Sequence, residues 1–188
     1  MYISLNENPF YIIKLLERRK DDLENEYYKI LRKLPFYQEY KNVNTILYLL
    51  KDNEMFETNL MKNLFAVDFE NYKDNGSTIT NLKYAHMPFG PAVNNRYEIY
   101  NFLLKNNYIE IESMDGEYGT KFKSIFDFDS NLFTEEEINT LKLIKDKMKN
   151  KTAKKLSDWS HEFIGWRNTK NGEIISYKYA NSFDINLL

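Results

Sequence analysis

Asp68 is the residue of this sequence whose position most clearly calls for a chemical explanation. It lies four residues after Leu64 and four before Tyr72, which places its carboxylate on the apolar stripe of an expected helix. A carboxylate buried there is costly unless it accepts hydrogen bonds. We favour an acceptor role toward the backbone N–H groups of a nearby loop or toward a Tyr hydroxyl. A catalytic acid or base is the alternative, but it would need a cleft and a partner group that the sequence does not show.

The chain has two histidines, His86 and His161, and no cysteine. Thiolate catalysis and cysteine-based zinc sites are therefore excluded, and a histidine-rich metal site cannot be built, so we expect neither metal nor cofactor. His161 follows Ser160 and lies three residues after Asp158. Neighbours on one helix do not easily adopt the geometry of a Ser-His-Asp triad, and the sequence has no nucleophile elbow. We expect His161 to pack or cap beside Trp166, and we expect the protein not to be an enzyme.

Residues 84–91 combine aromatic and rigid residues at unusual density. Pro88 and Pro91 fix the φ angle at two points, and Gly90 permits a backbone conformation that other residues avoid. A rigid, aromatic loop loses little entropy on docking, so it makes a good protein-binding surface. The plainer interpretation is an ordinary helix start at Pro91 with Phe89 as a core anchor. For His86 the sequence leaves burial and exposure both open.

A helix that starts at Pro91 would also offer a binding site for a negative group. The first turn of a helix has N–H groups without partners inside the helix, and these can bind an anion or a carboxylate. The sequence therefore allows an anion site where this loop ends.

Apolar residues at helical spacing predict four helices in the first half of the chain. The predicted ranges are 9–34, as one kinked helix or a helical hairpin, 43–50, 59–73 and 91–105. Thr58 is the expected N-cap of the third helix. Asn75-Gly76 is its expected end, because glycine tolerates the left-handed cap.

Strand periodicity follows the fourth predicted helix. Residues 108–112 and 120–125 alternate apolar and charged side chains on either side of an Asp115-Gly116 turn, which predicts a β-hairpin. Glu110 and Glu112 on the first strand are expected to pair with lysines on the second. Because an isolated hairpin is only marginally stable, a helix must lie beneath it.

Helical signals return in the last third of the chain. Thr134 and Glu137 form a capping box, and Thr152 is the expected cap of a further helix. Asn171-Gly172 predicts a turn, and residues 174–179 form a last element of undetermined type. The predicted fold class is mainly α with α+β character: a compact helical domain with one β-hairpin wing, preceded by an N-terminal helical extension.

The charge balance does not favour nucleic acid or a membrane as a partner. The chain has 26 basic and 28 acidic residues, a net charge of −2, whereas domains that bind nucleic acid are usually basic. Seven lysines within residues 142–155 are interpreted as a solvated helix face, with an acidic partner as the alternative. No apolar run approaches the roughly 20 residues that span a bilayer. Residues 1–10 lack the apolar block of a signal peptide, so we expect a soluble, cytoplasmic protein.

The run of residues 60–91 resembles the Panacea domain, the SocA-type antitoxin family of bacteria and phages. The matching positions are Leu64, Phe65, Asp68, Tyr72, Gly76, Ile79, Thr80, Tyr84, Pro88, Phe89, Gly90 and Pro91. The later stretches FTEEEINTLKLIKDK, LSDWSHEFIGW and GEIISYKYA look like the C-terminal half of that domain, so His161 and Trp166 also fall on its motifs. The resemblance covers about residues 40–180.

The resemblance implies an antitoxin that neutralises a cognate protein toxin by direct contact. It also implies two parts, an N-terminal helical extension over residues 1–40 and the Panacea domain over residues 41–188. Self-association stays open. Within this interpretation the rigidity of the loop assigns the toxin contact to Tyr84, His86, Met87 and Phe89.

Two other functions are weighed against the antitoxin. A winged-helix-like transcriptional regulator would use the hairpin as its wing, but Glu110 and Glu112 on that wing would repel phosphate. A phage-associated adaptor protein is the other alternative.

Overall fold

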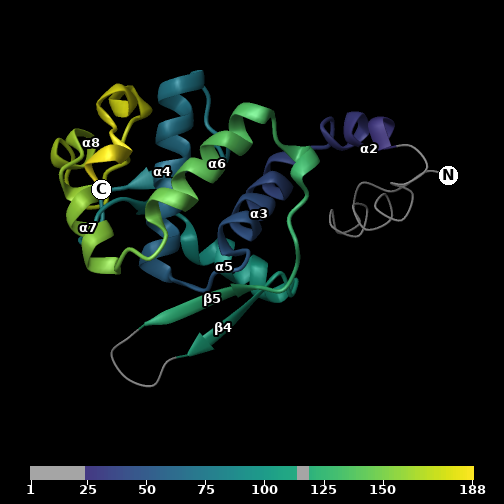
Figure 1. Cartoon of the computed structure of the whole chain (residues 1–188), viewed down its shortest axis with the longest axis horizontal. Coiled ribbons are helices and arrows are strands. Elements are labelled where there is room, and N and C mark those ends of the chain that lie inside the picture. Colours follow the sequence, from purple (N-terminus) through teal and green to yellow (C-terminus); the bar gives the residue numbers. More distant parts are fainter. Residues whose placement is uncertain (1–23, 114–118) are drawn as a thin grey trace.

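The computed structural model describes residues 24–113 and 119–188. The helices are α2 (Glu24–Leu31), α3 (Tyr37–Leu50), α4 (Glu57–Asn75), α5 (Arg96–Lys105), α6 (Glu135–Met148), α7 (Ala153–His161) and α8 (Ile164–Arg167). The strands are β1 (Met55–Phe56), β2 (Tyr84–Ala85), β3 (Ala92–Val93), β4 (Ile109–Ser113) and β5 (Thr120–Ser124), and the 3-10 helices are η2 (Ser130–Leu132), η3 (Tyr177–Ser182) and η4 (Ile185–Leu187). Figure 1 shows α3, α4, α6, α7 and α8 together above the β4–β5 hairpin, with α2 apart from them at the upper right. The predicted class, mainly α with a small β part, is confirmed.

Helix α4 is the central element of the fold. It packs against α3, α6, α7, β3 and η3, and every residue from Leu60 to Asn71 is buried. A helix enclosed in this way must bury polar side chains as well as apolar ones, and Asp68 and Lys62 are among them. The predicted stop is confirmed, because Gly76 forms a left-handed C-cap with φ of 70°.

The predicted N-cap of α4 is wrong. The helix begins at Glu57, directly after strand β1, and Phe56 is the capping residue without a side-chain hydrogen bond. Thr58 therefore lies inside the first turn. The reason is tertiary: Phe56 pairs with Lys121 of β5, and the chain turns into the helix as soon as that strand pairing ends.

Both strands of the predicted hairpin are confirmed and a third strand joins them, whereas the predicted Asp115-Gly116 turn lies outside the described residues. The sheet has the order β1-β5-β4, and Glu110 and Glu112 lie opposite Lys123 and Lys121. The expected ion pairs between these residues are wrong, however. The ammonium groups of Lys121 and Lys123 lie 3.9 and 4.0 Å from the Glu54 carboxylate, just before β1.

The helix predicted to start at Pro91 begins later, at Arg96. Ala92 and Val93 instead form β3, which pairs antiparallel with Tyr84 and Ala85 of β2. Both β3 residues are buried, so the pairing satisfies backbone groups that would otherwise lack partners in the core. No helix N-terminus exists at Pro91, and the anion site expected there is absent.

The last third of the described chain follows the sequence signals closely. The capping box of Thr134 and Glu137 opens α6, and Thr152 caps α7 by accepting a hydrogen bond from the Lys155 N–H. After α8 the chain returns to β2: the Ile175 N–H donates to the Tyr84 carbonyl at 2.8 Å. The element of undetermined type thus becomes a bridge to β2 followed by η3.

The predicted N-terminal helix lies only partly within the described residues. Helix α2 covers its second half, and residues 9–23 lie outside the described ranges. Within those ranges no helix is both long and apolar enough to cross a membrane.

Candidate functional site

Asp68 organises the segment that leads into the loop of residues 86–91. Its Oδ1 accepts the backbone N–H groups of Ile79 and Thr80 at 2.9 Å each, and its Oδ2 accepts the Tyr84 hydroxyl at 2.7 Å and the Thr80 hydroxyl. Burial raises the pKa of Asp68, although these hydrogen bonds act in the opposite direction. The favoured interpretation, a buried acceptor for loop N–H groups and a Tyr hydroxyl, is confirmed.

Tyr84 lies in the core, which corrects its assignment to the toxin contact. Its ring is fully buried among Phe65, Phe69 and Tyr177, and its hydroxyl donates to Asp68 and to the Leu64 carbonyl. The sequence places Tyr84 next to the loop, but the β2–β3 pairing turns its side chain inward. Tyr84 therefore fixes the base of the loop.

Donors from three helices hold the carbonyl groups of the loop. The Trp166 indole donates to Met87 O at 3.2 Å, the Ser157 hydroxyl to Phe89 O at 2.8 Å, and Lys62 Nζ to Pro91 O at 2.9 Å. These donors come from α8, α7 and α4. We call this arrangement the loop clamp. It fixes the backbone at alternate residues, and Pro88 and Phe89 remain exposed.

Gly90 is required by both conformation and space. Its φ is 89°, a region that favours glycine. A Cβ atom at this position would lie 2.1 Å from the Ser160 hydroxyl and 2.9 Å from Lys62 Cε. At Gly90 the loop backbone therefore lies so close to α4 and α7 that no space remains for a Cβ atom.

Two imidazole rings stack on the Trp166 indole. His86 and His161 each lie with ring centroids 4.1 Å from it. His86 is half-buried, and its Nδ1 lies 3.0 Å from the Trp166 carbonyl. Burial, and then the nearby Lys62, lower the pKa of His161. The expected packing of His161 beside Trp166 is confirmed.

Phe89 is the most exposed large apolar side chain of the described residues, at 73%. Tyr97, at the start of α5, is also exposed, and the Arg96 guanidinium lies 4.3 Å from its ring centroid. Between them a hollow of about 350 Å³ is lined by Met61, Lys62 and the loop. The site thus offers two exposed rings and a cation beside a concave surface. The interpretation of Phe89 as a core anchor is wrong.

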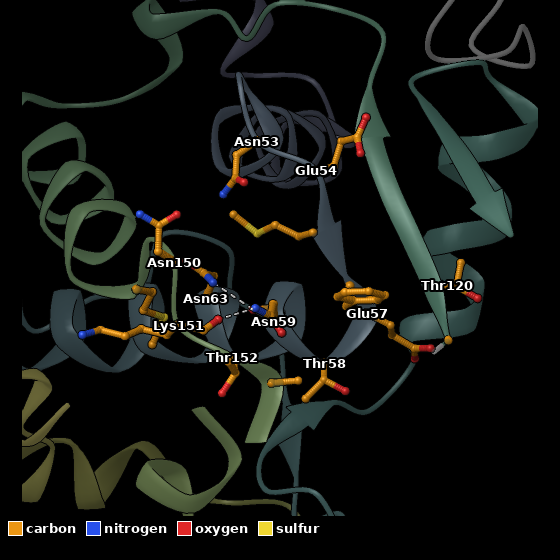
Figure 2. A pocket seen from close by; sticks show the side chains of 15 residues that line it. Asn53, Glu54, Glu57, Thr58, Asn59, Asn63, Thr120, Asn150, Lys151 and Thr152 are labelled. Atoms are coloured by element: carbon orange, nitrogen blue, oxygen red, sulfur yellow. Dashed lines mark hydrogen bonds between the residues drawn. The ribbon is translucent and has the colours of Figure 1, made fainter. Parts of the chain in front are cut away.

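A second hollow of about 570 Å³ lies beside the N-terminus of α4 (Figure 2). Asn59 and Asn63 lie within it: Asn59 donates to Lys151 O, and Asn63 donates to Asn59 O. The side-chain oxygens of both asparagines accept no hydrogen bond from the described residues. Sequence reasoning missed this hollow, because its lining comes from segments as distant as Asn53 and Asn150 and follows no local pattern.

The remaining predicted motif residues support the fold around the loop. Tyr72, for example, stacks on Tyr177 with ring centroids 5.2 Å apart.

The lysine-rich stretch of residues 142–155 is mostly a solvated surface. Five of its seven lysines are exposed, whereas Lys145 donates to the carbonyls of Tyr48 and Lys51 at the end of α3. Within the described residues, no cluster of three His, Asp or Glu side chains could hold a metal ion.

A family model described as "Antitoxin SocA-like, Panacea domain" matches residues 60–167. The matched range begins in α4 and ends in α8, so it contains Asp68, the loop and all three donors of the loop clamp. It covers more than half of the chain. No curated protein and no solved structure matches.

Proposed function

This chain belongs to the family of SocA-like antitoxins with a Panacea domain, and on that premise we propose that it neutralises a cognate protein toxin by binding it directly. The binding surface of the proposal consists of the loop of residues 86–91 and the first turn of α5. The chain catalyses no reaction in this proposal. The contact residues are Met87 and Phe89 of the loop, with His86 at its base and Tyr97 beside it.

The single observation that carries the proposal is the exposure of Phe89 on a clamped backbone. A phenylalanine that is 73% exposed loses most of the stabilisation that burial would give it. Its carbonyl is nevertheless held by Ser157, so the ring is displayed from a fixed position. Exposed aromatic side chains on a rigid backbone have the properties of interface hot spots, because little entropy is lost when a partner covers them.

The neighbouring residues extend this surface. Arg96 lies over Tyr97 and also pairs with Glu57 at 3.1 Å, which holds the cation at the rim of the smaller hollow. Interfaces are enriched in arginine and tyrosine for this combination of apolar area and polar contact. A toxin side chain that enters the hollow would meet Met61, which is part of its lining.

Co-expression tests the proposal. The protein product of the neighbouring reading frame should be toxic alone and harmless together with this chain. Phe89→Ala should weaken binding of an inactive variant of that product by about 2 kcal/mol or more, measured by calorimetry, and leave the melting temperature unchanged.

Leu187→Ala is the matched control, since Leu187 is exposed to almost the same extent, at 72%, but lies in η4. The control should bind as the wild type does. Toxicity that persists in the presence of the wild-type chain would refute the proposal, and a Phe89→Ala chain that unfolds would show that Phe89 supports the core.

A further inference from the structure

Strand β4 forms an open edge of the three-stranded sheet. In the order β1-β5-β4 it is the outer strand, and Figure 1 shows it as the lowest strand of the molecule in that view. It pairs with β5 over five residues and with no other strand of the described chain. An edge strand of this length presents a row of backbone groups to which another strand can bind.

The register determines which backbone groups lie on that edge. The Ile125 N–H donates to Tyr108 O at 3.1 Å, and these residues lie directly opposite each other if the ladder is extended by one pair. Because hydrogen-bonded pairs alternate along an antiparallel ladder, Glu110 and Glu112 bond to β5. The N–H and C=O groups of Ile109 and Ile111 therefore point away from β5, and because Ile109 is buried, at 2% exposed, Ile111 is the residue that presents them at the open edge.

The other side of β5 supports this assignment. Phe122 lies opposite Ile111 in a pair that does not bond to β4, so its backbone groups must point toward β1. They meet Met55 there, which is the partner of Phe122 in the β1–β5 pairing. The alternation of hydrogen-bonded and non-hydrogen-bonded pairs in the β4–β5 ladder is thus consistent with the β1–β5 pairing.

The side chains along β4 indicate the chemistry of a partner. Glu110 and Glu112 are exposed on one face and have no ion-pair partner among the described residues, since the lysines opposite them lie near Glu54. On the other face Ile111 is 41% exposed beside the buried Phe122. The edge therefore offers two free carboxylates on one face and an apolar contact on the other.

We propose that β4 receives an extended segment of the toxin as an additional strand, with Lys or Arg side chains facing Glu110 and Glu112 and an apolar side chain against Ile111. This inference rests on the proposed function. Main-chain hydrogen bonds would supply affinity and the alternating side chains specificity. A second copy of this chain fits less well, because two antiparallel β4 edges would bring four glutamates together.

Ile111→Pro tests strand addition directly. Proline removes only an N–H that points to the open edge, so the bonds to β5 remain. We expect binding of the inactive toxin to weaken at least tenfold while the melting temperature stays close to that of the wild type. Ile111→Val is the matched control: it keeps the N–H and an apolar, β-branched side chain, and should bind within about twofold of the wild type.

Hydrogen exchange on the wild-type protein provides a measurement that no folding defect can disturb. The Ile111 amide should exchange at least tenfold more slowly when the inactive toxin is bound, whereas the Glu110 amide is protected already. Glu110→Lys combined with Glu112→Lys should weaken binding at low salt and remove most of its salt dependence.

The outcomes separate this inference from the proposed function. A wild-type complex in which the Ile111 amide stays unprotected, or an Ile111→Pro variant that binds the toxin as well as the wild type does, overturns strand addition and leaves the antitoxin proposal standing. Failure of the wild-type chain to bind the toxin at all overturns both. Protection that rises with the concentration of this chain alone would assign the edge to a second copy and overturn the choice of partner.

Discussion

At the scale of single residues, burial determines what the polar side chains of α4 can do. Asp68 and Lys62 lie on the same central helix, six positions apart, and both are almost inaccessible to solvent. Each acts on the backbone near the loop: Asp68 accepts the N–H groups that precede β2, and Lys62 donates to the carbonyl that precedes β3. Two buried polar residues thus fix both ends of the segment that carries Phe89.

Asp68→Ala is expected to destabilise the protein by about 1–3 kcal/mol, because the N–H groups of Ile79 and Thr80 and the Tyr84 hydroxyl lose their acceptor. Urea unfolding measures the change. Asp74→Ala, at an exposed position of the same helix, is the control and should stay close to the wild type. An unfolding midpoint for Asp68→Ala equal to that of the control would contradict the acceptor role.

At the scale of elements, the loop is the connection of a two-stranded sheet rather than the approach to a helix. Strands β2 and β3 each have two residues, too few for any periodicity that a sequence could reveal. Their pairing, the bridge from Ala85 to Ile174 and the loop clamp together determine the loop. Helices α4, α7 and α8 therefore act on the site through hydrogen bonds to its backbone.

Trp166→Phe isolates one contact of the loop clamp. Phenylalanine keeps a ring between the histidines but loses the N–H that donates to Met87 O. A neutral hydrogen bond is worth about 0.5–1.5 kcal/mol, and this sets the upper limit for the ordering of the loop that a toxin must then supply, so binding should weaken by up to about tenfold in calorimetry, with a loss of stability of up to the same size.

Trp159→Phe is the matched control for this substitution, since the Trp159 indole donates to Asp184 O, away from the loop. It removes a bond of the same kind and should leave toxin binding unchanged. Equal binding by both variants would mean that the clamp does not preorganise the surface.

At the scale of the whole molecule, the buried lysine makes global stability depend on pH. Burial lowers the pKa of Lys62 to about 7, whereas in the unfolded chain it is near 10.5. Between these values the unfolded state binds a proton that the folded state does not, so the free energy of unfolding increases with pH. Integrated from pH 7 to pH 9, this linkage amounts to about 2 kcal/mol.

Lys62→Met should remove that rise. Urea unfolding at pH 7, 8 and 9 should give the wild type and the exposed control Lys154→Met increasing free energies, and Lys62→Met a nearly constant one. Well below pH 7 Lys62 is protonated in both the folded and the unfolded state, so it should add no further pH dependence to the free energy of unfolding of the wild type. The same slope in wild type and Lys62→Met between pH 7 and pH 9 would show that Lys62 is charged in the folded state.

Local signals in the sequence determined many of the elements and several of their ends. The capping box at Thr134, the cap at Thr152 and the stop at Gly76 depend on residues within one turn of each other, and the structure confirms them. The alternation in residues 108–112 and 120–125 predicted both strands of the hairpin in the same way. The position of Asp68 on the apolar stripe also predicted its role, because a buried carboxylate needs donors.

The tertiary structure alone decided what the loop presents and which groups hold it. Three loop carbonyls accept hydrogen bonds from Lys62, Ser157 and Trp166, which lie on helices far apart in the chain. The spacing of residues in the sequence does not predict such long-range contacts. The pairing of β2 with β3 directs the Tyr84 side chain into the core and leaves Phe89 exposed. In the three-stranded sheet, Lys121 and Lys123 form their ion pairs with Glu54 and not with Glu110 and Glu112. The physical reason is common to these cases: periodicity and capping depend on neighbours within a few residues, whereas long-range contacts determine which side chains are buried and which partners they find.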